Sequence, residues 1–156
     1  MENYKNPISL FKQTNFSKTI WWKLKVNISG YQNETEDKLV TEIFKNRIFR
    51  LIYPNIYQNN HKFSRILVQL YEDGYVCWIN LDGLIIEKYE LGKPENSKKE
   101  HFFIKDKVNS ILKWIKDQSE LNNEYLWGGT LGPNFDCSGL IQTAFLKHHI
   151  HIPRDS

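Results

Sequence analysis

The residues with the clearest chemical potential form a short stretch around Cys137, which runs from Phe135 to Gly139 as Phe-Asp-Cys-Ser-Gly. A glycine-rich loop precedes this stretch, and apolar residues follow it at helical spacing: Leu140, Ile141, Ala144 and Phe145. We therefore expect Cys137 in the first turn of a helix. The thiolate is the reactive form of cysteine, and the free N–H groups of a helix N-terminus stabilise a negative charge. This placement predicts a nucleophilic cysteine.

Asp136, directly before the cysteine, has two interpretations. A carboxylate disfavours a second negative charge on the neighbouring thiolate, so its presence calls for another reason. One reason is that Asp136 is the N-cap of the helix, a position where aspartate is favoured. The other is that it binds a cationic group of a substrate. The two roles are compatible.

Three blocks of sequence carry a resemblance to a known family: Tyr125-Leu-Trp127-Gly-Gly, Asp136-Cys-Ser-Gly-Leu140 and Ile152-Pro-Arg-Asp-Ser156. They resemble the start of the catalytic domain of NlpC-type cell-wall peptidases, papain-like cysteine peptidases that cut murein peptides. The likeness is strongest to the γ-D-glutamyl-L-diamino acid endopeptidases of cyanobacteria and bacilli. In those enzymes a bacterial Src-homology-3-like (SH3-like) barrel precedes the catalytic domain. A lone cysteine is more often a small buried hydrophobe, but the three linked blocks favour a nucleophile.

The resemblance implies that Cys137 attacks the γ-D-Glu–diamino acid amide of peptides with a free N-terminal L-Ala, in cell-wall recycling. Asp136 would hold the amine of that L-Ala. The other implied substrate contacts are Tyr125, Trp127, Ser138 and Ser156. For Tyr125 and Trp127, packing in the core under the loop is an equally good interpretation. For Arg154 with Asp155, a structural ion pair is favoured over a role in the chemistry.

The barrel of this subfamily helps to close the substrate pocket, and Tyr75 or Glu72 stands where that contact would come from. A solvated turn residue is the simpler interpretation of either one.

A cysteine nucleophile needs a base, normally a histidine within hydrogen-bond reach. His148 and His149 lie roughly 16–18 Å from Cys137 along the predicted helix, at about 1.5 Å per residue. His151 follows in the exit loop, and His61 and His101 match no family motif. Because the family's histidine lies downstream of the last block, we expect only the first half of a catalytic domain, with an incomplete catalytic apparatus.

Upstream of these blocks the sequence predicts short strands separated by turns. Alternating or apolar runs occur at 22–28, 39–43, 47–53, 64–71, 75–79 and 84–89. This pattern indicates a small antiparallel β-barrel or sandwich. The stretch from Tyr71 to Ile79 resembles the bacterial SH3-like pattern, which implies the barrel. Cys77 stands where that pattern usually has glycine, so we interpret it as a packed strand residue without chemistry.

The predicted fold class is α+β, with the SH3-like barrel followed by the N-terminal helical half of a papain-like NlpC domain. Helical spacing from Phe103 to Asp117 predicts the first helix of the second domain. The predicted organisation is a flexible tail at 1–18, the barrel at 19–90, a linker at 91–101 and a truncated catalytic domain at 102–156.

Composition excludes several functional classes. The net charge is +3 without a basic block, which gives little support to nucleic-acid binding. No run is long enough to span a membrane and no secretion signal is apparent, so a cytoplasmic location is expected. The resemblance implies no metal and no organic cofactor. The implied partner is a murein peptide, L-Ala-γ-D-Glu-diamino acid.

The rival hypothesis is a binding module, a barrel with a catalytic remnant that captures cell-wall peptides or is completed by a second polypeptide. An acyltransferase on the same scaffold is a third option. Without the rest of a papain-like sheet, the apolar face of the cysteine helix would be partly exposed: Leu140, Ile141, Ala144 and Phe145. Such a face predicts poor solubility or oligomer formation.

Overall fold

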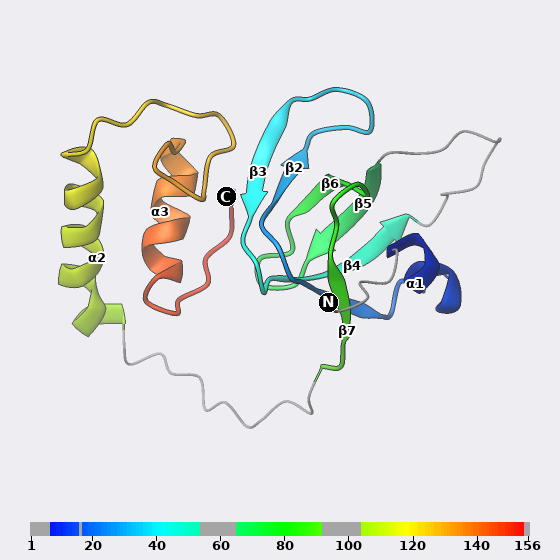
Figure 1. Ribbon diagram of the computed structural model, residues 1–156. Helices are drawn as coiled ribbons and strands as arrows, with labels where there is room; N and C mark the ends of the chain where they lie inside the picture. The colour runs from blue at the N-terminus through cyan, green and yellow to red at the C-terminus, as the bar shows by residue number, and fades with distance from the viewer. Residues whose placement is uncertain (1–6, 16, 54–64, 92–103, 155–156) are drawn as a thin grey trace, which may run out of the picture.

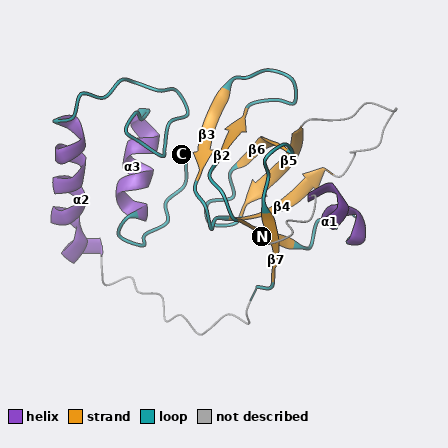
Figure 2. Ribbon diagram, in the orientation of Figure 1, coloured by secondary structure: helices purple, strands orange, loops and turns teal. Residues whose placement is uncertain are grey.

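The computed structural model describes residues 7–15, 17–53, 65–91 and 104–154. Its architecture is α+β, as predicted: a short helix, a seven-stranded antiparallel sheet and then two further helices. Helices α2 and α3 lie side by side, and α3 with the loop before it lies next to strand β3 (Figures 1 and 2). The short helix α1 lies on the other side of the sheet from α2 and α3.

The sheet has the strand order β3-β2-β6-β5-β4-β1-β7, with every neighbouring pair antiparallel. Strands β3 and β7 are therefore the outermost. The strands are β1 (Trp21–Leu24), β2 (Ile28–Tyr31), β3 (Leu39–Ile43), β4 (Ile48–Tyr53), β5 (Arg65–Leu70), β6 (Val76–Asn80) and β7 (Ile86–Tyr89).

One strand prediction was wrong. The run at 22–28, expected as one strand, is divided between β1 and β2, and Ser29 and Gly30, which follow that run, lie inside β2. Packing explains the glycine: a Cβ at Gly30 would lie 2.8 Å from Cys77 Sγ and 2.8 Å from Thr41 Cγ2. Gly30 thus allows β2 to lie close to its neighbours, a use of glycine that local turn statistics do not predict.

A single apolar core lies against the sheet. Its side chains come from β1, β3, β4, β5 and β6, and Phe49, Val68 and Ile79 are fully buried. Strand β3 at one end of the order and β1 near the other end both contribute, so the sheet curls around this core. Alternation of buried and exposed residues along β5 and β6 shows the period of two that the sequence predicted.

The N-terminal segment corrects another prediction. Residues 1–18 were expected to form a loosely held tail, but Pro7–Gln13 form helix α1. Phe11 in this helix is fully buried, and its ring meets Trp22 edge to face at 5.1 Å between centroids. Ile8 and Leu10 of the same helix pack against the core together with Phe11. Three apolar residues in a helix of seven are too short a pattern to indicate a helix from the sequence.

Two helices follow the sheet. Helix α2 spans Ile104–Ser119 and α3 spans Cys137–Leu146, close to the predicted positions. Ile111 of α2 is buried, and Trp114 packs edge to face on Phe135, 6.0 Å away. The predicted linker at 91–101 lies outside the described residues except for Leu91. In the described part of the chain, no helix combines the length and apolar character needed to cross a membrane.

Candidate active site

Cys137 is the first residue of α3, as the sequence predicted, and its side chain is exposed. The chain enters the helix from a loop in which Tyr125 pairs with Phe135 in an isolated β-bridge. The N–H of Leu126 also donates to the Phe135 carbonyl at 3.2 Å. The loop therefore folds back on itself and presents Cys137 at the surface, at the positive end of the helix dipole.

Asp136 is the N-cap of α3 and the centre of a buried hydrogen-bond network. Its Oδ1 accepts from the Gly139 N–H at 2.7 Å and from the Ser138 hydroxyl at 3.2 Å. Its Oδ2 accepts from the Gly128 N–H at 2.8 Å. The residue is 7% exposed. One carboxylate thus joins the glycine-rich loop to the first turn of the helix, which is the capping role expected of aspartate.

Arg154 completes this network. Its Nη1 donates to Asp136 Oδ1 at 2.9 Å and its Nη2 donates to Oδ2, a two-pronged pair between buried side chains. Burial alone raises the pKa of the Asp136 carboxyl, but the hydrogen bonds from Arg154, Gly139 and Gly128 outweigh it and hold the pKa below its ordinary value of 3.8. Asp136 is therefore a charged structural centre beside the cysteine.

The structure shows a structural ion pair for Arg154, as favoured from the sequence, with Asp136 as the partner. Asp155 lies outside the described residues. The pairing with Arg154 also affects the interpretation of Asp136 as a binding site for a cationic group of a substrate. Both carboxylate oxygens already accept several hydrogen bonds and the charge is matched by a guanidinium. A substrate ammonium would have to displace one of these donors.

Tyr125 and Trp127 are on the surface. They are 65% and 60% exposed, so the alternative of core packing under the loop is wrong for both. The aromatic residue that fills that core position is Phe135, at 9% exposure. Tyr125 pairs through its backbone with Phe135, two residues before Cys137, so both exposed aromatic residues belong to the loop that leads into the cysteine. They are available to contact a bound peptide.

The remaining predicted contacts are placed differently. The Ser138 hydroxyl donates to Asp136 and accepts from Arg154 Nη1 at 3.1 Å, so it belongs to the buried network. Ser156 lies outside the described residues. Tyr75 follows the turn between β5 and β6 and packs partly against the sheet core. The substrate role of Tyr75 stays a prediction.

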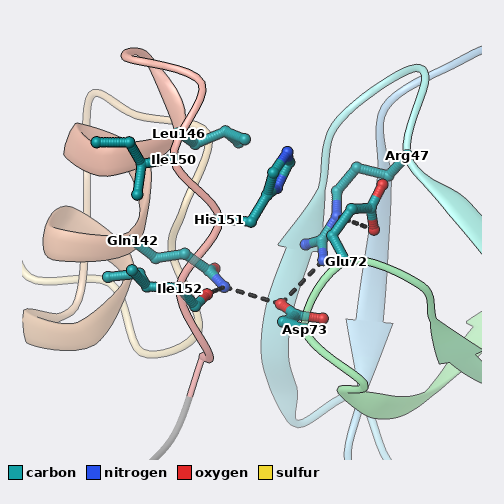
Figure 3. Close-up of a pocket in the computed structure, with 8 residues that line it drawn as sticks. All are labelled: Arg47, Glu72, Asp73, Gln142, Leu146, Ile150, His151 and Ile152. Atoms are coloured by element: carbon teal, nitrogen blue, oxygen red, sulfur yellow. Dashed lines mark hydrogen bonds and ion pairs between the residues drawn. The ribbon is translucent and has the colours of Figure 1, made fainter. Parts of the chain in front are cut away.

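Glu72, expected as a solvated turn residue, is instead part of a buried ionic cluster. Its carboxylate accepts from Arg47 Nε at 3.2 Å and from the Ile48 N–H at 3.1 Å. Asp73 pairs with Arg47 Nη2 at 2.9 Å and accepts from the Gln142 side chain of α3 at 2.8 Å. Figure 3 shows this cluster facing α3, with the Gln142–Asp73 bond crossing between the two parts of the chain.

The described histidines lie away from Cys137. His148, His149 and His151 follow the C-terminal end of α3, and His61 and His101 lie outside the described residues. A cavity of about 510 Å³ opens at that same end, between α3 and the turn that contains Phe44 and Asn46, and His149 and His151 line it. The cavity and the cysteine are at opposite ends of the helix. No described residue group offers three metal-ligating side chains together.

Cys77 contrasts with Cys137. It is 2% exposed in β6, and burial, partly offset by Arg47, raises the pKa of its thiol to about 12. Its interpretation as a packed strand residue is confirmed. Both cysteines are free thiols.

Sequence analysis missed the residue that joins the sheet to the cysteine loop. Glu42 on β3 accepts from the N–H groups of Thr130 and Leu131 at 2.9 and 2.8 Å. Its backbone carbonyl accepts from the Thr130 hydroxyl at 2.6 Å. A glutamate on a predicted strand with polar neighbours reads as a solvent-facing residue, so no local signal identifies this contact.

Comparison with known proteins agrees with the resemblance. Residues 122–156 match the NlpC/P60 family of peptidases, which are hydrolases that act on peptidoglycan peptides. The chain is also similar to the gamma-D-glutamyl-L-lysine dipeptidyl-peptidase of Bacillus cereus (strain ATCC 10987 / NRS 248). The two are 56% identical over 32 residues, which are 20% of this chain and 10% of that protein. The family match at 122–156 contains Tyr125, Asp136 and Cys137.

Among solved structures, NlpC2 from Trichomonas vaginalis is similar at a TM-score of 0.33 and 18% sequence identity. The match covers 86% of this chain and 43% of that one. This chain therefore spans less than half of that structure and about a tenth of the curated relative.

Proposed function

We propose that this chain contributes the nucleophile of a cysteine endopeptidase that hydrolyses the γ-D-Glu–diamino acid bond of murein peptides. The observation that carries the proposal is the placement of Cys137: exposed, at the N-terminus of α3, in the segment that matches a family of peptidoglycan peptidases. A buried cysteine in the same motif would be inert, as Cys77 is.

The proposed reaction is an acyl transfer. The Cys137 thiolate attacks the carbonyl carbon of the γ-D-Glu amide, and the carbonyl oxygen becomes an oxyanion in a tetrahedral intermediate. N–H groups at the start of a helix have no acceptor within the helix, so the Cys137 N–H is suited to donate to that oxyanion. Collapse releases the diamino acid amine and leaves a thioester on Cys137, which water then hydrolyses.

Both steps need a base that the described residues do not place near the cysteine. His148 and His149 follow the other end of α3, and the helix from Cys137 to Leu146 is roughly 13–14 Å long at about 1.5 Å per residue. The proposed histidine must therefore come from outside the described residues or from a second polypeptide. Asp136 is not a substitute, because its carboxylate is bound to Arg154 and its pKa is lowered.

The proposed substrate is a peptide with the sequence L-Ala-γ-D-Glu followed by a diamino acid. The name of the Bacillus relative supports L-lysine at that third position. Tyr125 and Trp127 are exposed aromatic side chains on the loop that leads into the nucleophile, and such side chains suit contact with the peptide backbone and the stem of the diamino acid. We further propose that the sheet is the SH3-like barrel, that α2 and α3 are the helical half of a papain-like domain, and that the protein acts in cytoplasmic recycling.

A second candidate function has its own support. The exposed Tyr125 and Trp127 would serve binding equally well, and the described histidines are far from Cys137. These facts favour a module that captures murein peptides without cleaving them.

The test incubates the chain with L-Ala-γ-D-Glu-L-Lys and with the matching meso-diaminopimelate peptide, and detects the released diamino acid by mass spectrometry. Cys137→Ala is the matched control, and binding of both peptides is measured in parallel by calorimetry. Release that disappears in Cys137→Ala supports the peptidase. Binding without release supports the capture module. Release that persists in Cys137→Ala, or neither binding nor release, contradicts both.

A further inference from the structure

Strand β3 holds the cysteine loop at two places. Glu42 accepts the N–H groups of the consecutive residues Thr130 and Leu131, and its carbonyl accepts from the Thr130 hydroxyl. The Val40 carbonyl accepts from Arg154 Nη2 at 3.3 Å. Val40 and Glu42 flank the buried Thr41 on an outermost strand, so these carbonyls face the free edge of the sheet. Thr130 of the loop and Arg154 donate the hydrogen bonds that these edge carbonyls accept.

Contacts between the loop and α3 carry this attachment toward Cys137. The Thr130 carbonyl accepts from the Thr143 hydroxyl of α3 at 2.7 Å. The neighbouring Gly129 carbonyl accepts from the Asp136 N–H at 3.3 Å. Thr130 and Thr143 are 1% and 3% exposed, so both bonds are shielded from water. The loop that Glu42 anchors is thus bonded both to the middle of α3 and to the residue before the cysteine.

Close packing accompanies these bonds. Gly128 has φ +80°, and a Cβ there would lie 3.0 Å from the backbone carbons of both Leu39 and Val40. The loop therefore lies directly on β3. The N–H groups of Thr130 and Leu131 both donate to the Glu42 carboxylate. A charged acceptor forms stronger hydrogen bonds than a neutral one. Removing the carboxylate would leave both donors without their partner in a largely buried place.

We propose that Glu42 is a positioning residue, which fixes the cysteine loop on the sheet and so holds Cys137 and the first turn of α3 in their reactive geometry. The sheet is then a part of the active-site scaffold and more than a neighbouring domain. The effect on catalysis rests on the proposed peptidase function; the effect on the geometry of Cys137 does not.

The test measures the alkylation rate of each cysteine by iodoacetamide at neutral pH, resolved by peptide mass spectrometry. It compares the wild-type chain with Glu42→Ala, Glu42→Gln and the control Glu87→Gln. Glu87 is a matched control because it lies on β7, the other outermost strand, in an exposed pair with Lys25. Cys77 is an internal reporter of general unfolding, because its thiol is buried.

We expect Glu42→Ala to slow the alkylation of Cys137 about threefold or more, because the N–H groups that stabilise the thiolate lose their fixed orientation. Glu42→Gln keeps an acceptor oxygen and should restore part of the rate, while Glu87→Gln should match the wild type. Cys77 should stay unmodified in all of them. Equal Cys137 rates in Glu42→Ala and wild type would overturn the proposal, as would a parallel rise in Cys77 labelling.

A second variant covers the case in which Glu42→Ala does not fold. Thr130→Val keeps the shape of the side chain and removes the hydroxyl that donates to the backbone carbonyl of Glu42, the second bond by which this residue holds the loop, and it should slow Cys137 alkylation in the same direction. An unchanged rate in Thr130→Val would then overturn the proposal. If the wild-type chain hydrolyses the murein peptide, Glu42→Gln should lower kcat with little change in KM. If the wild-type chain does not hydrolyse the peptide but Glu42→Ala still slows Cys137 alkylation, the positioning role of Glu42 is supported and only the proposed peptidase function fails.

Discussion

Trp22, Phe49 and Ile79 of the sheet are at most 1% exposed, whereas Leu112 of α2 and Ile141 of α3 are 57% and 40% exposed. The sheet surrounds its own apolar core. The helical part has few buried apolar side chains, and its described bonds to the sheet are polar, through Glu42, Asp73 and Val40. The comparison indicates that the sheet is stabilised by burial, while the helical part depends on specific hydrogen bonds to keep its place.

The two cysteines show the same difference at the scale of one side chain. Cys77 is packed between strands, where burial raises the pKa of its thiol to about 12. Cys137 stands at the surface on the other part of the chain. The accessible cysteine therefore lies in the helical part, which has few buried apolar side chains, and the well-packed sheet holds the loop that precedes it.

The largest expected effect comes from breaking the sheet core. Phe49→Ala removes a fully buried ring and should lower the free energy of unfolding by about 3–5 kcal/mol, since buried aromatic truncations leave a cavity. Urea unfolding followed by circular dichroism measures this. Ile141→Ala is the comparison on the helical part, and an equal loss there would contradict the difference between the two regions.

Breaking the buried pair should have the next largest effect. Arg154→Met keeps most of the side-chain volume but leaves the Asp136 carboxylate buried without its cation, at a cost of about 3 kcal/mol. Hydrogen exchange should speed up at Gly128 and Gly139, whose N–H groups donate to Asp136, and stay unchanged in β5 and β6. Uniform acceleration through the sheet would show that the two regions do not differ in this way.

Acid should destabilise the helical part, because protonation of Asp136 weakens its hydrogen bonds and its ion pair with Arg154. Because the pKa of this carboxyl is lowered on folding, its stabilising contribution is fully present above the ordinary value of 3.8 and is lost as the pH falls through the lower folded value. Exchange at the Gly139 amide, corrected for the intrinsic rate, should therefore rise on acidification below about pH 4. Protection that stays constant down to pH 2 would contradict the assigned role of the carboxylate.

The smallest expected change in stability comes from two exposed apolar side chains, Leu112 of α2 and Ile141 of α3. Leu112→Glu and Ile141→Glu should change the free energy of unfolding by less than about 0.5 kcal/mol, because both side chains already meet solvent. They should nevertheless reduce self-association, which we expect of the wild-type chain because large exposed apolar patches favour association. Light scattering measures this, and a monomeric wild-type chain would refute the expectation.

Local sequence signals predicted much of the fold. Alternation identified most strands, and the loop-to-helix transition identified the start of α3 at Cys137. The expectation of a partly exposed face was correct for Ile141, but Ala144 is fully buried. Helix α1 was missed because its apolar residues, Ile8, Leu10 and Phe11, form too short a pattern to indicate a helix. The division between β1 and β2 was missed because Gly30 allows the strands to pack closely and does not form a turn.

The candidate site was predicted in part, for a physical reason. The position of Cys137 at the start of a helix depends on residues adjacent to it in the sequence, and a sequence motif contains those residues. The supports of the site connect distant segments: Glu42 with Thr130, Arg154 with Asp136 and Asp73 with Gln142. Such pairs depend on how the helices pack against the sheet, and local patterns in a single sequence do not predict that packing.

The most direct test of the central claim is protection of Cys137 by substrate. The chain is alkylated with iodoacetamide in the presence and absence of saturating L-Ala-γ-D-Glu-L-Lys, and the modification of each cysteine is measured by peptide mass spectrometry. We predict that the peptide slows modification of Cys137, that the same peptide with an acetylated N-terminus does not, and that Cys77 is modified only after unfolding. An unchanged Cys137 rate at saturating peptide would contradict the claim that this cysteine lies at the centre of a murein-peptide site.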